Sequence, residues 1–175
     1  MYDASAKEVK NGTSLNDCLH TGPSLNPLLF EILVRSRENR VALVRDIKTA
    51  FLNIAVGVNN SDCLRFLWVD DARDNNSVVV MYRFCRVVFG LNASPFLLNV
   101  TIRHHLATFT GADLKFVKKM VDSFYVHDLV SSDSTTDKAH DLYNKARARM
   151  ANGGFRLRKW KTNDPKLKRR IGDGR

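Results

Sequence analysis

The chain has 175 residues, of which 44% are hydrophobic, which is enough for one domain with a substantial core. It contains no run of about 18 apolar residues, and its first residues lack the basic and apolar regions of a signal peptide. These features exclude a membrane-spanning helix and a secreted product, so we expect an intracellular protein, cytoplasmic or nuclear. Three scattered cysteines in no metal-binding spacing are expected to be reduced and structural.

The positive charge is concentrated at one end of the sequence. Residues 1–144 carry 16 basic and 16 acidic side chains, whereas residues 145–175 carry 12 basic and 2 acidic ones and so account for the whole formal charge of +10. A basic segment of this kind suits a polyanion, because contacts to phosphates release bound counterions. The alternative is a solvated helix face followed by a frayed tail.

Short elements separated by turn signals are expected in the first half of the chain. Asn-Gly, Gly-Pro and Asn-Pro pairs predict loops with a short strand over residues 1–26, and the spacing of leucine and isoleucine predicts a helix over 27–37. A short apolar run over Val41–Arg45 predicts a buried strand that ends on an aspartate. Two β-rich runs, Cys63–Val69 and Val78–Phe84, predict a hairpin closed by a polar loop.

Helices are expected to follow this hairpin. A proline predicts the first turn of a helix over 95–109, with Ser94 as its cap, and a further helix is expected over 112–120. Neighbouring residues of a helix point to different faces, so we expect surface or interhelical positions for His104 and His105.

A hairpin, a helix and a strand are expected to complete the chain. The hairpin covers Phe124–Ser131, and Ser134–Asp137 predicts a capping box before an apolar helical stripe that stops at Gly153 and Gly154. Alternating residues predict a final strand over Phe155–Lys161. Because this order mixes helices with hairpin-connected strands, we expect an α+β fold with helices packed on an antiparallel sheet.

The strongest chemical signal is the segment Ser123–Val130, an apolar strand that enters a polar two-residue tip and leaves as a second apolar strand. Template-directed polymerases carry two adjacent aspartates on such a hairpin, but here the first position is His127 and only Asp128 is acidic. Joining nucleotides requires two divalent ions about 3.5–4 Å apart, held by carboxylates from separate strands. We therefore expect Asp46, at the end of its predicted strand, to converge with the hairpin tip.

A third element, residues 86–96, breaks an apolar strand at Gly90 and restarts as a helix at Pro95. Gly90 and Ala93 are small, which would let a flat base pair or a template backbone approach closely. An ordinary strand–loop–helix joint explains the same pattern, so the sequence leaves both interpretations open.

Taken in order, these motifs resemble the reverse transcriptase of long-terminal-repeat retrotransposons, and most closely the BEL/Pao group. The matching segments cover nearly the whole chain: Tyr-Asp-Ala-Ser-Ala-Lys (2–7), Ser-Leu-Asn-Asp-Cys-Leu (14–19), Thr-Gly-Pro (21–23), Asp-Ile-Lys-Thr-Ala-Phe-Leu-Asn-Ile (46–54), Leu-Arg-Phe-Leu-Trp (64–68), Arg-Val-Val-Phe-Gly-Leu-Asn-Ala-Ser-Pro-Phe-Leu-Leu-Asn (86–99), Tyr-Val-His-Asp-Leu-Val (125–130) and Gly-Gly-Phe-Arg-Leu-Arg-Lys-Trp (153–160). The resemblance implies a polymerase palm-type antiparallel sheet with packed helices and partial fingers over residues 1–161, followed by a basic C-terminal tail over 162–175. It also implies RNA-directed DNA polymerisation by two-metal nucleotidyl transfer, with an RNA/DNA primer-template and dNTPs as partners and Mg²⁺ or Mn²⁺ as the cofactor.

The same resemblance implies roles for single residues. Asp46 and Asp128 match metal-binding aspartates of the family, and the backbone carbonyl of Ile47 would assist them. Phe51 matches an aromatic steric gate that favours dNTPs, although core packing explains this residue equally well. The positions expected to bind nucleotide or template are Phe51, Phe89, Gly90, Asn92, Ser94, Pro95, Tyr125 and Lys159, with Lys161 as the alternative to Lys159 for the lysine that protonates pyrophosphate.

Two departures from the family pattern bear on activity. His127 occupies the position of the catalytic aspartate that bridges the ions, and a neutral imidazole is a poor ligand for Mg²⁺. The thumb, RNase H and integrase segments of the family are also absent from the sequence. We therefore expect this copy to be inactive as a polymerase; the alternatives are a non-catalytic nucleic-acid-binding remnant and a decayed transposon fragment.

Overall fold

The computed structural model describes residues 3–71, 73–74, 76–109 and 113–172. The chain forms two compact units, which we call the hairpin unit (Met1–Gly22 and Phe51–Ser94) and the sheet unit (Pro23–Ala50 and Pro95–Arg175). Within the described ranges, no helix combines the length and the apolar character needed to cross a membrane.

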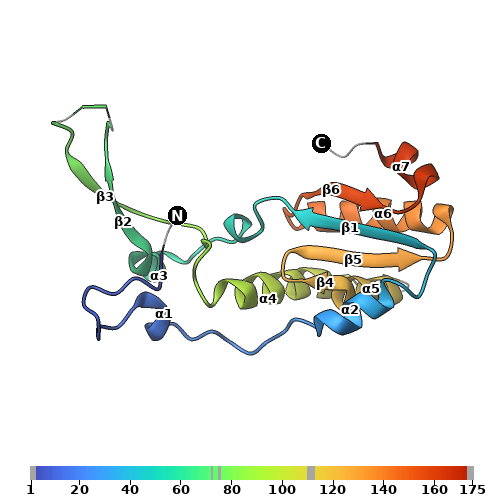
Figure 1. Ribbon diagram of the computed structural model, residues 1–175, viewed down its shortest axis with the longest axis horizontal. Coiled ribbons are helices and arrows are strands. Elements are labelled where there is room, and N and C mark those ends of the chain that lie inside the picture. Colours follow the sequence, from blue (N-terminus) through green and yellow to red (C-terminus); the bar gives the residue numbers. More distant parts are fainter. Residues whose placement is uncertain (1–2, 72, 75, 110–112, 173–175) are drawn as a thin grey trace. The chain divides into compact units, whose positions relative to one another are not determined.

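The sheet unit is built on four antiparallel strands in the order β4-β5-β1-β6 (Figure 1). Its strands are β1 (Val41–Ile47), β4 (Phe124–Tyr125), β5 (Asp128–Asp133) and β6 (Leu157–Thr162). The sequence predicted these strands with small differences at their ends. Because β1 lies between β5 and β6, the end of an early strand is flanked on both sides by segments from the last third of the chain.

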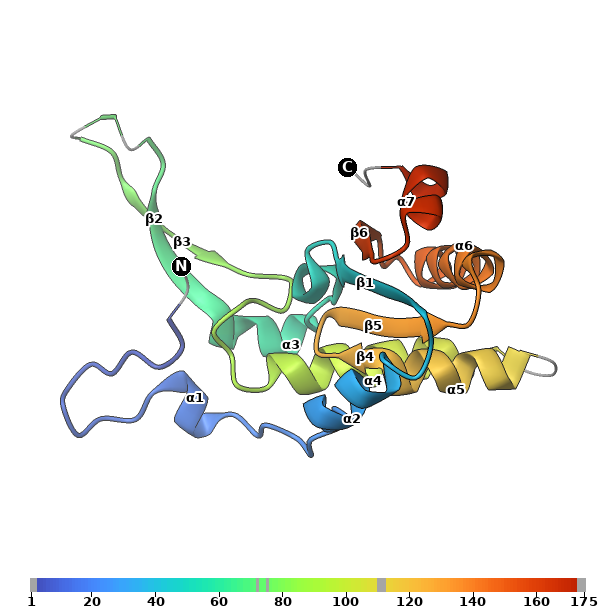
Figure 2. The same cartoon turned by 45° about the vertical axis from the view of Figure 1, so that its right-hand side comes forward.

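Helices cover the sheet and provide its core. They are α2 (Leu29–Arg35), α4 (Ser94–Ala107), α5 (Leu114–Ser123), α6 (Thr136–Asn152) and α7 (Pro165–Ile171). Figure 2 shows α6 and α7 together beside β6. Val41 and Leu43 of β1 pack against Ala139 and Leu142 of α6 and against Leu167 of α7. One face of the sheet is therefore apolar and covered, as expected for helices packed on an antiparallel sheet.

The helix starts differ from the predictions in their capping. The predicted capping box is wrong, because the N-cap of α6 is Thr135, whose hydroxyl accepts from the backbone N–H of Lys138 at 3.3 Å. Asp137 pairs with Arg170 at 2.5 Å instead of bonding back to the cap. α4 includes Ser94 as its first residue.

Two other predicted segments also differ from the structure. The predicted helix 112–120 corresponds to α5, and residue 112 lies outside the described residues. Within the predicted basic tail, residues 165–171 form α7. Asp164 caps this helix by accepting from two backbone N–H groups, and Leu167 is fully buried, so part of the basic C-terminal segment belongs to the core.

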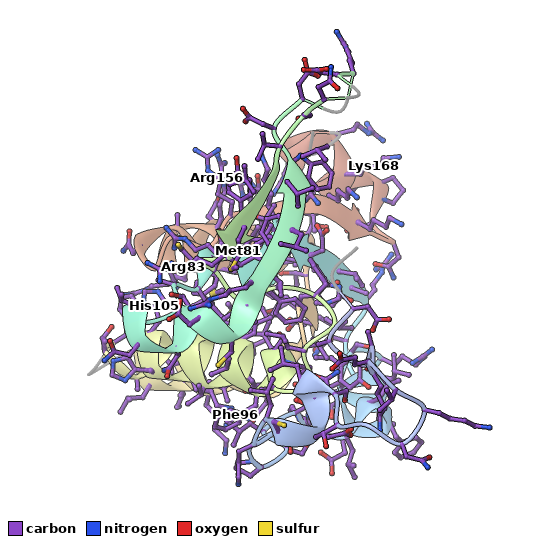
Figure 3. All side chains as sticks on the ribbon, turned by 90° about the vertical axis from the view of Figure 1, so that its left-hand side faces the viewer. Met81, Arg83, Phe96, His105, Arg156 and Lys168 are labelled. Carbon is purple, nitrogen blue, oxygen red and sulfur yellow. The ribbon has the colours of Figure 1, made fainter. Side chains whose placement is uncertain are left out.

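The hairpin unit has a separate small core. Its elements are α1 (Leu15–Cys18), α3 (Val58–Ser61), β2 (Arg65–Val69), β3 (Val79–Arg83) and the 3₁₀ turns η1 (Ala50–Asn53), which begins one residue before this unit, and η2 (Asp62–Leu64). β2 and β3 pair antiparallel, as the sequence predicted, and Figure 3 labels Met81 and Arg83 on β3. No strand occurs in the described part of residues 1–26; a reciprocal capping box between Ser14 and Asp17 starts α1 there instead.

A close contact joins α4 to the end of α6. The ring of His105 lies against Gly153, where an added Cβ would meet ring carbon Cδ2 at 2.7 Å. Nε2 of the same ring lies 2.7 Å from the carbonyl oxygen of Arg149. The interhelical position predicted for this histidine is confirmed, and His104 is exposed.

Replacing Gly153 with alanine should lower the free energy of unfolding by about 1–3 kcal/mol, because the new methyl group overlaps the His105 ring. Urea denaturation measures the effect. In a His105→Ala background the same substitution should have a much smaller effect, since the overlapping ring is gone. Equal losses in the two backgrounds would show that the ring is not the obstacle.

Candidate active site

The register between β1 and β5 places two carboxylates opposite each other. Asp46 of β1 pairs with Asp128 of β5. Side chains alternate along β1, so Leu43 and Arg45 are buried on the face that packs against the helices, while Asp46 projects from the other face. Directly opposed residues have Cβ atoms about 4.5–5.5 Å apart, and like charges at such positions repel.

The hairpin tip beside these carboxylates has an unfavourable backbone conformation. Val126 and His127 connect β4 to β5, and Val126 has φ +52°, which is a genuine outlier for a β-branched residue. Its backbone N–H donates to Oδ1 of Asn26 at 3.2 Å, and the carbonyl of His127 accepts from the N–H of Ile47 at 3.0 Å. The tip is thus bonded both to β1 and to the chain before α2.

His127 lies next to Asp128 at this tip. Its Nε2 is 3.8 Å from Oδ2 of Asp128, and its Nδ1 is buried with no hydrogen-bond partner within the described residues. The imidazole side chain is about half exposed. The structure therefore brings Asp46, His127 and Asp128 together at one end of the sheet.

On the other side of β1, Asp46 faces a cation that the sequence analysis did not single out. Arg158 of β6 pairs with Asp46 in the sheet, and its Nε lies 3.5 Å from Oδ2 of that carboxylate. The second oxygen, Oδ1, is buried and makes no hydrogen bond to any described residue. The contact is an ion pair at long range that leaves one carboxylate oxygen available.

A buried arginine supports this arrangement from the covered face. Arg45 is 2% exposed, its guanidinium lies 4.3 Å from the centre of the Trp160 ring, and it donates to the carbonyl oxygens of Asp46 and Arg158. Burial lowers the pKa of Arg45 to about 10, and the negative charges of Asp46 and Asp128 act in the opposite direction. Arg45 thereby ties the backbone beside Asp46 to β6.

β6 contains a bulge at the position where it passes Asp46. The register with β1 shifts between Val44 and Asp46, and Lys159 has φ +54° at this point. After the bulge, Lys161 is paired with Val44, so it shares a face with Asp46. Lys159 is exposed on the bulge itself. The role of either lysine as a proton donor stays a prediction.

Two of the residues predicted to face nucleotide or template have their polar groups occupied within the hairpin unit. The Ser94 hydroxyl is buried and donates to the carbonyl of Val88 at 2.7 Å. Asn92 donates from its side chain to the carbonyl of Asn16 at 2.7 Å, and its backbone N–H donates to the side chain of Asn16 at 2.9 Å. These hydrogen bonds stabilise the loop before α4, and they account for the serine and the asparagine at these positions.

The other predicted contact residues differ in exposure. Phe51 is buried, and its ring meets the exposed ring of Phe89 edge to face with ring centres 4.8 Å apart. Packing therefore accounts for the aromatic residue at position 51. The role of Phe51 as a steric gate stays a prediction. Gly90 has φ +97°, a backbone conformation that glycine adopts readily and other residues rarely adopt, so the backbone accounts for the glycine at this position. Pro95 lies in the first turn of α4, and Tyr125, half buried in β4, pairs with Asp128.

The donors for a cation at this site are few. Within the described ranges, no group of three or more His, Cys, Asp or Glu residues is arranged to hold a metal ion. Asp46 and Asp128 are the two carboxylates of the candidate site, and the free Oδ1 of Asp46 is the type of buried, unbonded atom that a cation would satisfy.

Comparisons with known proteins agree with this fold. Neither the protein-family models nor the curated proteins contain a match to the sequence. Among solved structures, the chain is similar to a foamy viral protease-reverse transcriptase in complex with an RNA/DNA hybrid, with a TM-score of 0.55 and 17% sequence identity. The similarity covers 75% of this chain and 15% of the viral chain, so the present chain spans a small part of that protein's length. The chain has a reverse-transcriptase-like α+β fold.

Replacing Asp128 with asparagine should raise the free energy of unfolding of the metal-free protein by about 0.2–1 kcal/mol, because it removes one of two opposed negative charges. Denaturation with a chelator present and at about pH 8, where an ordinary histidine is neutral, measures this effect. Asp70→Asn, in the exposed loop of the β2–β3 hairpin, is the matched control and should change little. A loss of stability in Asp128→Asn would mean that the carboxylate has a stabilising partner.

Proposed function

We propose that the sheet unit is the palm of an RNA-directed DNA polymerase related to those of long-terminal-repeat retrotransposons of the BEL/Pao group, and that His127 silences it in this copy. The single observation behind the proposal is the pairing of Asp46 with Asp128 on the face of the sheet opposite the α6 and α7 core, within a reverse-transcriptase-like fold. Opposed carboxylates destabilise a sheet unless a cation lies between them, which suits a metal site better than a structural one.

The donor set favours Mg²⁺ or Mn²⁺, because both carboxylates and a backbone carbonyl are hard oxygen ligands. Asp46, Asp128 and the carbonyl oxygen of Ile47 would hold the two ions. When bound, the ions would stabilise the attacking and leaving oxygens of a nucleotidyl transfer. The chain's own contribution is to fix the two carboxylates by sheet register and to hold the hairpin tip through Asn26.

Positive side chains on the same face suit the polyphosphate substrate. Arg158 and Lys161 project from β6 beside Asp46, and either Lys161 or Lys159 would donate a proton to the leaving pyrophosphate. Tyr125, next to Asp128 in the hairpin, would lie near the primer end. A primer-template and dNTPs are the partners of this proposal.

The imidazole of His127 explains the proposed loss of activity. It brings no negative charge at neutral pH, and nitrogen ligands are poorly suited to Mg²⁺. Asp46 and Asp128 would then have to balance two dications, while Arg158 already offsets part of the charge of Asp46. A single substitution would restore the third carboxylate without disturbing the fold, since His127 is about half exposed.

We expect the parent chain to give no primer extension on an RNA template with either Mg²⁺ or Mn²⁺, and the His127→Asp variant to extend the primer. The gain should exceed about 100-fold, because a bridging carboxylate stabilises charge directly at the metal site. Gel analysis of a labelled primer measures the products.

The control is Asp46→Asn in the His127→Asp background, which should abolish the recovered extension. Extension that survives this substitution would place the activity elsewhere and contradict the site. Equal extension by the parent chain would contradict the role given to His127. If neither the parent nor His127→Asp extends, the proposal of a restorable palm fails.

A non-catalytic nucleic-acid-binding role is the second candidate, favoured by the concentration of the whole net charge in residues 145–175. Such a role would give binding of primer-template that weakens steeply with salt and does not depend on sequence. It requires neither Asp46 nor Asp128, so the Asp46→Asn control leaves it unchanged.

A further inference from the structure

A strongly basic cavity lies where β1, α6 and β6 meet. Its volume is about 520 Å³, and its lining includes Lys48, Arg147, Arg156 and Arg158 but no carboxylate. The four cations come from the turn after β1, from the last part of α6, from the residue before β6 and from β6 itself. Arg156 is labelled in Figure 3 beside the ribbon of the C-terminal elements.

The backbone around this cavity is held by hydrogen bonds. The N–H of Lys48 donates to the carbonyl of Arg156 at 2.8 Å, and the N–H of Phe155 donates to the carbonyl of Met150 at 2.9 Å. Phe155, which also lines the cavity, is 2% exposed, and Leu157 pairs with Ile47 in the sheet. The cations therefore project from a fixed frame and not from a loose tail.

Two of the cations that line this cavity, Arg147 and Arg156, form no ion pair with a described residue. The Nε of Arg158 lies 3.5 Å from Oδ2 of Asp46 and makes no hydrogen bond to a described residue. Other arginines of the same unit are paired: Arg149 with Asp113, and Arg170 with Asp137. Like charges gathered around a hollow repel each other and attract an anion.

We propose that this cavity binds the phosphate groups of a polyphosphate or of a nucleic-acid backbone. Three of its four cations are arginines, whose planar forks match phosphate oxygens in a bidentate manner. Its volume lies in the range of small-molecule sites and exceeds the space that one phosphate needs. Binding of phosphate there does not require polymerase activity, because the cavity contains none of the residues proposed to hold the metal ions.

The test is calorimetric titration with inorganic pyrophosphate, with a chelator present so that no divalent ion contributes. The parent chain should bind pyrophosphate, and Arg147→Gln/Arg156→Gln should weaken binding by about tenfold or more, since each lost guanidinium removes charge-assisted hydrogen bonds. Both positions are exposed, so the variant should fold like the parent. The control Arg37→Gln/Arg169→Gln removes the same charge from exposed arginines outside the cavity and should change the affinity by less than about twofold.

A second titration distinguishes the two sources of phosphate. Single-stranded DNA of about 12 nucleotides that competes with pyrophosphate, and that loses affinity in the same double variant, would identify a backbone site. Pyrophosphate binding without such competition would identify a site for a free polyphosphate.

Failure of the parent to bind either probe, or an equal loss in both double variants, would overturn the proposal. Neither result depends on primer extension. A chain that binds pyrophosphate but never extends a primer therefore contradicts only the proposed polymerase.

Discussion

The register of β1 between β5 and β6 is the constraint on which the candidate site depends. It sets Asp46 opposite Asp128 on one side and opposite Arg158 on the other. A shift of this register by one residue would turn Asp46 toward α6 and α7 and bring Arg45 to the opposite face of the sheet, because side chains alternate along a strand. Burial of Val41 and Leu43 against α6 and α7 opposes such a shift, since it would expose both side chains.

Features that are unfavourable for stability gather at the same end of the sheet. The positive φ of Val126 and the unbonded atoms of Asp46 and His127 all occur within a few residues of the carboxylate pair. Strained backbone and unsatisfied polar atoms persist in proteins when the surrounding structure holds them and when the site has a use for them. Their coincidence here supports the proposed metal site, and His127 lies within it.

Charge is divided between two neighbouring regions of the sheet unit. The carboxylates of Asp46 and Asp128 lie at the end of β1 and the start of β5, while the charged side chains that line the cavity beside them are all cations. Arg158 belongs to both, because it contacts Asp46 and lines the cavity. This separation of negative and positive charge would place a cation and a phosphate-bearing anion next to each other, as the proposed nucleotidyl transfer requires.

The sequence by itself determined the elements and the identity of the main candidate residues. Strand periodicity, turn residues and the acidic tip are local signals, so they predicted β1, the β4–β5 hairpin and the positions of Asp46, His127 and Asp128 at strand ends. The capping box of α6 was predicted wrongly and the helix over residues 165–171 was not predicted, because Asp137 and Leu167 are held by partners from distant segments.

Only the tertiary structure decided which side chains surround Asp46. Arg158 faces Asp46 because β6 pairs with β1. On the covered face, the guanidinium of Arg45 stacks on Trp160 and donates to the backbone carbonyls of Asp46 and Arg158. Asn26, which precedes α2, accepts a hydrogen bond from the hairpin tip. None of these contacts has a sequence signature, since each joins residues far apart in the chain. They follow from strand register and from the bulge at Lys159, which are set by packing across the whole sheet and not by local composition.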